Sequence, residues 1–280
     1  MPEVRTVTSL ERAARPAASA DLAAPIRFVG DTLTIARSEL RKVVRDPTEL
    51  LTRAAQPILW LLVFGQVIAS VRAIPTGSLP YLDFLAPGVL AQSALFSAIF
   101  YGIAVIWERD LGIVHKLLAS PASRTALVSG KALSGGFRAL IQATIVYLVA
   151  GVLGIHLKLD LPDLIGVGLI IVLGSAVFAT FSLDIACIVR SRERFMGIGQ
   201  LLTMPLFFAS SAVYPVSVMP DWLKAIAAVN PLTYMVDALR SLMVQGGASD
   251  RGLPMDIAVL VVALVAMVAL GSRLYPRLAR

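Results

Sequence analysis

Cysteine and histidine are scarce in this chain of 280 residues, which has one Cys and two His. The single cysteine, Cys187, excludes an intrachain disulfide and a cysteine-based metal site, and it is typical of a small buried apolar residue. His115 and His156 fall in different gaps between apolar runs, so neither is placed to serve a Ser-His hydrolase. No HExxH motif occurs. We therefore predict no catalytic residue and no metal site.

A nucleotide site is also missing from the sequence. Gly130-Lys131 lacks the upstream glycine and the following Ser or Thr of a phosphate-binding loop, and the chain contains no Asp-Glu dipeptide to end a Walker-B strand. The stretch Leu133 to Phe137 imitates the start of the signature motif of ATP-binding-cassette ATPases. Its small residues are better explained by close helix approach. We predict that this chain binds no cofactor.

Charged residues make up only 15% of the chain, whereas hydrophobic residues make up 57% and the mean hydropathy is +0.79. This composition is unlike that of an ordinary soluble domain. The apolar residues gather in six runs without Asp, Glu, Lys or Arg, each close to the roughly 20 residues that cross a bilayer as a helix. The runs are Ala54 to Val71, Phe84 to Trp107, Ala139 to Leu157, Leu164 to Leu183, Phe195 to Pro220 and Ile257 to Ser272.

The sequence thus predicts an all-α polytopic membrane protein with six transmembrane helices. We expect a disordered cytoplasmic tail over residues 1–25, an amphipathic helix over 26–46 and a six-span domain over 47–280. The expected spans are about 54–71, 84–107, 127–155, 164–189, 195–213 and 254–273. A further run, Ala225 to Val236, is short and contains Pro231, so we interpret it as interfacial or re-entrant.

Basic residues are distributed unevenly between the gaps. With six spans, only Arg72, Lys158, Lys224, Arg240 and Arg251 lie on one side, which leaves 20 of the 25 Lys and Arg residues on the side of both termini. The positive-inside rule then places both termini in the cytoplasm and the chain in the cell membrane. The net charge of +7 reflects this topology and contact with lipid headgroups, so we expect no nucleic-acid partner.

Two segments outside the spans have helical periodicity. Val29, Leu33, Ala36, Leu40 and Val43 form an apolar stripe among basic residues, which predicts a helix on the membrane surface or against a soluble partner. The cytoplasmic segment Glu108 to Arg124 carries Leu111, Val114 and Leu118 on one face. That face suits docking into a groove on another protein or lying in the membrane interface.

Polar residues also occur within the spans. Lys131, Arg138 and Gln142 share one face of the third span, and Asp184 near the cytoplasmic end of the fourth could pair with Lys131 or Arg138. Such groups mark a transport pathway, or they are snorkelling side chains and a structural ion pair. On the external side, Trp222 and Tyr234 are interface anchors in a segment punctuated by prolines.

At these residues the chain resembles the membrane-spanning permeases of type-2 ATP-binding-cassette exporters, in the daunorubicin-resistance and nodulation lipo-oligosaccharide branch. The matching stretches run in order from the second span to the sixth. They are Phe84 to Gly88, Glu108-Arg109 with Gly112, Leu117 to Pro121 with Arg124, Gly130-Lys131, Pro220 to Leu223, Asn230 to Tyr234 and Asp237 to Arg240.

The resemblance implies a permease that forms a homodimer or heterodimer and recruits two copies of a separate ATPase subunit, which binds ATP and Mg. It also implies a connecting helix at Val29 to Val43 and external helices that cap the pathway, with cap residues Trp222, Asn230, Pro231 and Tyr234. The implied coupling helix docks on the ATPase, with coupling residues Glu108, Arg109, Gly112, Leu117, Leu118, Ser120, Pro121 and Arg124.

A drug, a lipid or a glycolipid-like amphiphile is the expected exported substrate. Two other classes of function stay open. One is a proton-driven secondary transporter that uses Asp184 as its relay, although the spans show no internal repeat. The other is a membrane scaffold that tethers an ATPase through the Glu108 to Arg124 segment.

Overall fold

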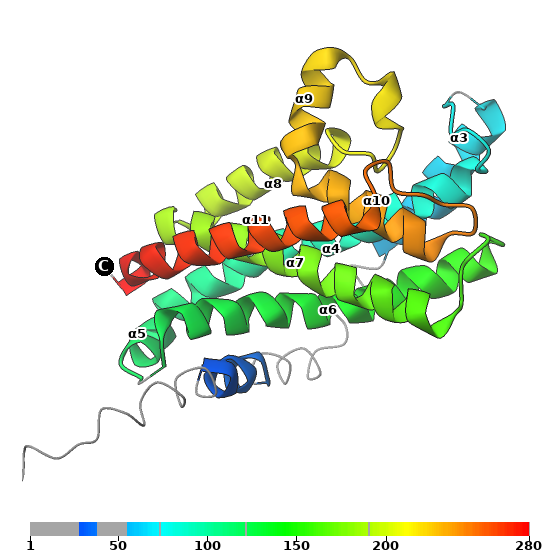
Figure 1. Cartoon of the computed structure of the whole chain (residues 1–280). Coiled ribbons are helices and arrows are strands. Elements are labelled where there is room, and N and C mark those ends of the chain that lie inside the picture. Colours follow the sequence, from blue (N-terminus) through cyan, green and yellow to red (C-terminus); the bar gives the residue numbers. More distant parts are fainter. Residues whose placement is uncertain (1–27, 38–54, 73, 121, 190, 280) are drawn as a thin grey trace, which may run out of the picture.

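The computed structural model describes residues 28–37, 55–72, 74–120, 122–189 and 191–279 (Figure 1). The predicted tail and the outer parts of the 26–46 segment lie outside these ranges. Within them the fold is helical, with one isolated antiparallel bridge between Leu157 and Val244. The elements after residue 59 are η2 (Trp60–Gly65), α3 (Gln66–Val71), α4 (Tyr81–Asp110), α5 (Ile113–Leu118), α6 (Arg124–Val152), α7 (Leu161–Ile188), α8 (Arg192–Phe208), η3 (Val216–Val218), α9 (Asp221–Val229), α10 (Pro231–Met243), α11 (Leu253–Leu274) and η4 (Tyr275–Ala279).

Four helices, α4, α6, α7 and α11, are long and apolar enough to cross a membrane. They coincide with the second, third, fourth and sixth predicted spans, within a few residues at each end. The first predicted span is a shorter apolar helix, Ala55–Val71, whose middle turns widen into the π-helix η2. The fifth corresponds to α8, which ends at Phe208, earlier than the predicted 213.

Helix α7 lies at the centre of the bundle, where it packs against α4, α6, α10 and α11. It is apolar on all sides, and a helix of that kind is stable only where neighbours or lipid surround it. Helix α11 has one packed side and exposes valines such as Val261, Val262 and Val265. An exposed apolar face of this kind suits contact with lipid.

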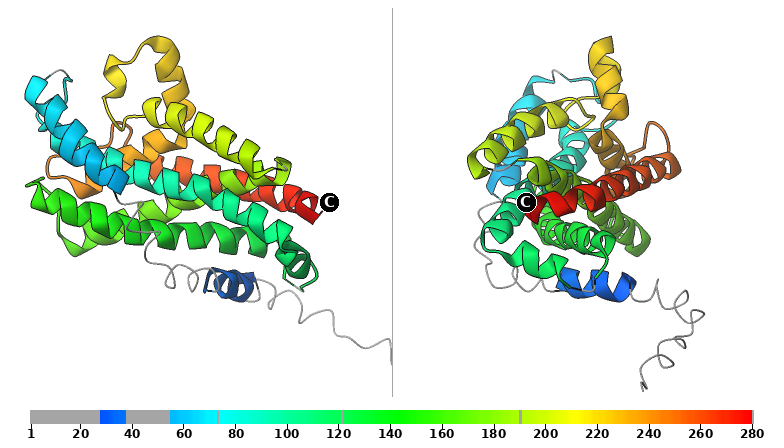
Figure 2. Two further views of the ribbon diagram at one scale, coloured as in Figure 1. Left: turned by 180° about the vertical axis from the view of Figure 1, so that it is seen from behind. Right: turned by 90° about the vertical axis from the view of Figure 1, so that its left-hand side faces the viewer.

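The bundle has two distinct ends (Figures 1 and 2). At the α5 end, α4 turns into α5, α6 begins, and the chain finishes in η4. The opposite end carries α9 and the loops that join α6 to α7 and α10 to α11. We call it the α9 end. Hydroxyl caps fix two helix starts at the α5 end, because Ser123 accepts from the Ala126 N–H at 3.2 Å and Ser191 from the Arg194 N–H at 3.3 Å.

Helix α10 enters the bundle at the α9 end and does not cross it. Most of its residues are buried, and it contacts α4, α7 and α11. This region overlaps the segment Ala225 to Val236 that we interpret as interfacial or re-entrant. A buried short helix is compatible with membrane depth because protein, and not lipid, surrounds its ends.

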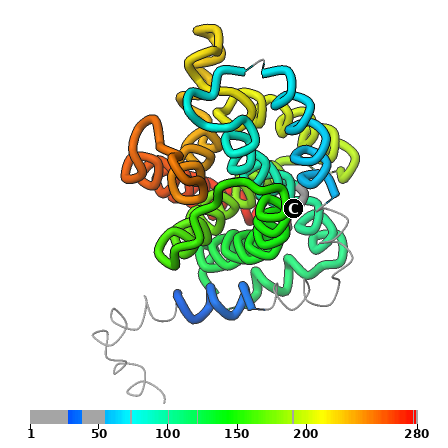
Figure 3. Tube along the Cα trace, turned by 90° about the vertical axis from the view of Figure 1, so that its right-hand side faces the viewer, coloured from blue at the N-terminus to red at the C-terminus, as the bar shows by residue number. Residues whose placement is uncertain are grey.

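The helix at 28–37 lies across α6, as the blue segment in Figures 2 and 3 shows. The two helices meet at Gly130 of α6. A Cβ methyl group added to this glycine would lie only 2.7 Å from Cβ of Ile35. Ala36 is buried, whereas Val29 and Leu33 are about half exposed. The exposed pair leaves an apolar surface beside α6 that suits a membrane interface.

Candidate functional site

The α5 end begins with a helix break at Gly112. Helix α4 continues to Asp110, so Glu108 and Arg109 belong to its last turn and not to a separate coupling helix. Gly112 has φ +72°, a left-handed conformation that glycine adopts without strain. This single residue reverses the chain into the short helix α5 and on toward α6.

The apolar face of α5 points into the molecule. Val114 is fully buried, and Leu117 and Leu118 pack against the hydrophobic core. Leu111 lies before the glycine break and is 66% exposed. The prediction that Leu111, Val114 and Leu118 share one docking face is therefore wrong, because the left-handed turn separates Leu111 from the helix that carries the others.

A different set of residues faces outward at this end. Leu111, His115 and Lys116 are exposed, as is Arg124 at the start of α6. Ser120 is half-buried and its hydroxyl donates to the Leu117 carbonyl at 2.6 Å, which closes α5. Pro121 lies outside the described residues.

A buried ion pair ties α4 to α6. Lys131 Nζ lies 2.5 Å from Glu108 Oε2, and both side chains are more than nine-tenths buried. The cations of Lys131 and Arg138 lie 5.8 Å and 5.4 Å from the centroid of the Tyr101 ring. Tyr275 of η4 lies near this pair, and burial raises the pKa of its phenol to about 12.

The predicted pairing of Asp184 with Lys131 is wrong. Lys131 points toward α4, where it contacts Glu108. Asp184 points toward α11: a methyl group added to Gly271 would lie only 2.6 Å from Asp184 Oδ1. Asp184 is 4% exposed. Among the residues that the structure describes, neither of its carboxylate oxygens has a hydrogen-bond partner.

Sequence reasoning missed a second link at the α5 end. Asp110 accepts from Arg109 of its own helix at 2.9 Å and from Arg192 of α8 at 2.6 Å. The Arg192 guanidinium also stacks over the Trp107 ring at 3.6 Å. No pattern within α4 or α8 alone indicates this contact, because the partners are about 80 residues apart.

The rest of the predicted polar face packs inside the bundle. Gly135 on the same face allows close contact with α7, since a methyl group there would lie 2.9 Å from Cβ of Ala179. Gln142 is 2% exposed. Neither of the two cavities described below is lined by Lys131, Arg138 or Gln142.

At the α9 end, Asn230 joins two helices. Its Nδ2 donates to the carbonyls of Leu206 and Ala209, each at 2.7 Å, and its Oδ1 accepts from the Leu232 N–H at 3.0 Å. The same side chain therefore satisfies carbonyls at the end of α8 and caps α10. Pro231 occupies the first position of α10, which suits proline.

Trp222 and Tyr234 have different environments. Trp222 is 66% exposed on α9, as a membrane anchor requires. Tyr234 is 7% exposed and its hydroxyl donates to the Ala228 carbonyl at 2.6 Å, so it fixes α9 against α10.

A buried charge pair lies beneath this cap. Asp237 Oδ1 accepts from Ser211 Oγ at 2.6 Å and from Arg240 Nη1 at 3.1 Å, and Arg240 Nη2 donates to the Ser211 carbonyl at 2.5 Å. The Arg240 guanidinium also lies 4.0 Å from the Phe84 ring centre. Burial raises the pKa of Asp237 and lowers that of Arg240, and each charge partly offsets the effect on the other.

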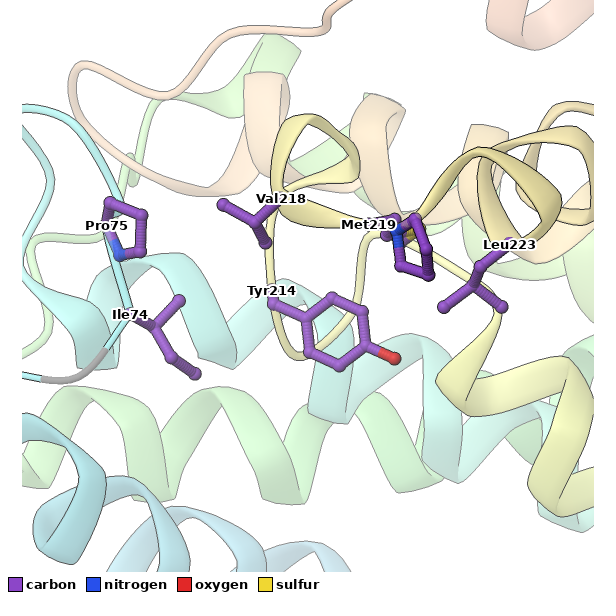
Figure 4. A pocket seen from close by; sticks show the side chains of 7 residues that line it. Ile74, Pro75, Tyr214, Val218, Met219 and Leu223 are labelled. Carbon is purple, nitrogen blue, oxygen red and sulfur yellow. The ribbon is translucent and has the colours of Figure 1, made fainter.

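Two cavities open at the α9 end. One, of about 490 Å³, is apolar and lies under α9 (Figure 4), lined by Ile74, Pro75, Tyr214, Val218, Met219, Pro220 and Leu223. The other, of about 300 Å³, has polar residues, which include Thr76, Ser78, Ser211, Ser217, Arg240 and Asp250.

Comparison with known proteins agrees with this architecture. The chain is 28% identical over 217 residues, 77% of this chain and 74% of the relative, to a protein named as transport permease ycf38 of Cyanophora paradoxa. It is 26% identical over 98% of its length, and 92% of the relative, to a daunorubicin resistance ABC transporter permease of Streptomyces coeruleorubidus. It is also 26% identical to nodulation protein J of Sinorhizobium fredii, over 69% of this chain and 73% of that protein.

The family described as "ABC-2 type transporter" matches residues 31–244. The match covers the 28–37 helix from residue 31, the break at Gly112, and α10 with its cap. This multi-pass membrane protein belongs to the ABC-2 type transporter family.

Proposed function

We propose that this chain is the permease subunit of an ATP-binding-cassette exporter in the cell membrane. It pairs with a second permease, and a separate ATPase subunit powers it. Its substrate is a drug, a lipid or a glycolipid-like molecule that leaves the cell. The name of the daunorubicin-resistance relative, an ABC transporter permease, supports export, and the absence of a nucleotide motif in the sequence supports a split system.

The observation that carries the proposal is the helical break at Gly112, which projects α5 from the bundle between two membrane-length helices. Since its apolar face is buried, the ATPase docks on the exposed residues Leu111, His115 and Lys116. Leu117 and Leu118 act indirectly, by holding α5 in place.

Movement of α5 is transmitted through the polar contacts behind it. The Glu108–Lys131 pair connects the end of α4 to α6, and the Asp110–Arg192 pair connects it to α8. A displacement of α5 by the ATPase therefore acts on three membrane helices at once. The coupling requires that these contacts differ between the two states of the permease.

The proposed orientation places the α5 end in the cytoplasm. The basic residues Arg109, Lys116, Arg124, Arg192 and Arg273 belong to helix ends on this side. The Ala55–Val71 helix and α8 then complete six spans. Both are only 17 residues long, which is enough for a bilayer that adapts locally.

Co-purification with an ABC ATPase subunit expressed together with the permease tests this docking surface. Lys116→Glu and Leu111→Asp change exposed side chains, so we expect folded permease that loses the ATPase. Val229→Asp, which is 79% exposed in the wild type at the other end, is the matched control and should retain it. Full retention of the ATPase by both α5-end variants would contradict the proposed docking surface.

Proton-driven transport is the second candidate, because Asp184 is a buried carboxylate without a hydrogen-bond partner among the described residues. In that case Asp184→Asn would abolish flux driven by a proton gradient. The exporter proposal predicts instead that flux requires ATP and survives collapse of the gradient. A vesicle flux assay with an ionophore separates the two.

A further inference from the structure

The two cavities at the α9 end share one wall. Pro75 lines both of them. On the neighbouring segment, Tyr214 and Val218 line the apolar cavity, whereas Pro215 and Ser217 line the polar one. The same two stretches of chain, 74–79 and 214–218, therefore border both an apolar compartment and a polar compartment.

The compartments differ in what they can bind. The apolar cavity is open under α9. Among its lining residues that the structure describes, only Tyr214 has a side-chain hydroxyl, which already donates to the Phe208 carbonyl at 2.5 Å. The polar cavity has hydroxyls at Thr76, Ser78 and Ser217. Volumes of about 490 and 300 Å³ are in the roughly 300–1,000 Å³ range of small-molecule sites.

The charges of the polar cavity indicate an uncharged ligand group. Its lining has one cation, Arg240, and one anion, Asp250. Arg240 is 5% exposed and its two terminal nitrogens are engaged by Asp237 and Ser211. The Asp250 carboxylate would repel an anionic ligand. The terminal nitrogens of Arg240 are already engaged, so they cannot offset that repulsion by a bidentate contact.

We propose that the two adjoining cavities bind a single-chain amphiphile across the Pro75 border that they share, with its tail under α9 and a small, uncharged, hydroxyl-bearing headgroup in the polar cavity. The occupant is an amphiphile because a polar compartment adjoins the apolar one. The proposal rests on the proposed function only for the side of the membrane on which the site lies. In an exporter, this site would receive the substrate as it leaves. Binding itself requires neither the ATPase nor transport.

The test is saturation binding of radiolabelled 1-O-decylglycerol to the full-length chain in nanodiscs, with empty nanodiscs subtracted for partitioning into lipid. We expect one saturable site for each chain. Glycerol alone should fail to compete at concentrations about a hundredfold higher, because it cannot fill the apolar cavity. Decyl phosphate should bind more weakly than the uncharged probe.

Two variants address the two compartments. Val218→Asn places a polar group in the apolar cavity and Asp250→Asn removes the carboxylate of the polar one. Each should raise Kd about tenfold. The controls Val229→Asn and Asp221→Asn make the same changes on exposed residues of α9 outside both cavities, and they should bind as wild type does.

Four results would overturn the proposal. Three of them are unchanged binding in both cavity variants, equal weakening in the α9 controls, and tighter binding of decyl phosphate. Binding to nanodiscs that hold one chain but not to those that hold two would assign this face to a second copy and would also overturn it. Since the ATPase is absent, failure here leaves the docking experiment at α5 as a separate test of the proposed function.

Discussion

Asn230 shows how a single side chain can join two elements, because it satisfies two carbonyls near the end of α8 and one N–H of α10. We expect Asn230→Ala to lower the free energy of unfolding by about 2–3 kcal/mol, since it leaves buried backbone groups without partners. Thermal unfolding of the purified permease measures this loss.

Asn230→Asp is the sharper variant at the same position. It keeps the capping oxygen but places a second oxygen against the carbonyls of Leu206 and Ala209, where the wild type has a donor. We expect it to be less stable than Asn230→Ala at neutral pH and to recover partly in acid, when the carboxyl can donate. Equal stability of the two variants across pH would contradict this role.

The buried pair of Glu108 and Lys131 leads to a second prediction. Lys131→Met removes the cation next to Glu108 and should destabilise the fold by about 3 kcal/mol, because a buried carboxylate loses its nearest cation. Combining it with Glu108→Gln should restore part of the loss. Lys116→Met, on the exposed face of α5, is the control and should leave the unfolding temperature unchanged.

Residue contacts of this kind were the least predictable part of the molecule. The spacing of Lys131, Arg138 and Gln142 indicates a shared face of α6 but not which neighbour that face meets. The sequence contains two acidic residues, Glu108 and Asp184, that could pair with Lys131. Lys131 pairs with Glu108 because α6 packs against α4. The Asp110–Arg192 contact had no local signal at all.

At the scale of elements, glycines set the closest approaches between helices. A methyl group on Gly88 of α4 would lie 2.7 Å from Cα of Ala212, a backbone atom that cannot rotate away. We expect Gly88→Ala to separate α4 from the 209–213 segment and to lower the unfolding temperature markedly. Differential scanning fluorimetry measures this change.

Gly151 of α6 is the matched control for Gly88. It also lies in a helix, but nothing within 4 Å would meet an added methyl group. Gly151→Ala should leave the fold intact and add up to about 1 kcal/mol from helix propensity. A similar loss of stability in both alanine variants would show that helix contact at Gly88 is not the cause.

Long elements were predictable and short ones less so. Runs of apolar residues located α4, α6, α7 and α11, because only a helix of that length satisfies its backbone in lipid. The direction of α5 was not predictable. It depends on the left-handed turn at Gly112 and not on the spacing of Leu111, Val114 and Leu118. The sequence predicted a short helix within the Glu108 to Arg124 segment but not which face of that helix is exposed.

At the scale of the whole molecule, the account requires the α5 end and the α9 end on opposite sides of the membrane. Cys187 is the single native cysteine and is buried, so a Cys187→Ser background is suitable for labelling. We expect Asp221→Cys on α9 to react with a membrane-impermeant maleimide in intact cells. Lys116→Cys on α5 should react only after permeabilisation, and the reverse pattern would invert the topology.

ATP-driven flux distinguishes an exporter subunit from a proton-driven transporter. The permease and the proposed ATPase partner are placed together in inverted vesicles. Accumulation of a fluorescent amphiphilic drug is then followed with ATP, and again with an ATPase variant that cannot hydrolyse ATP. The account predicts accumulation that needs ATP hydrolysis, persists without a proton gradient and is lost in Lys116→Glu. Accumulation that follows the proton gradient and ignores ATP would contradict it.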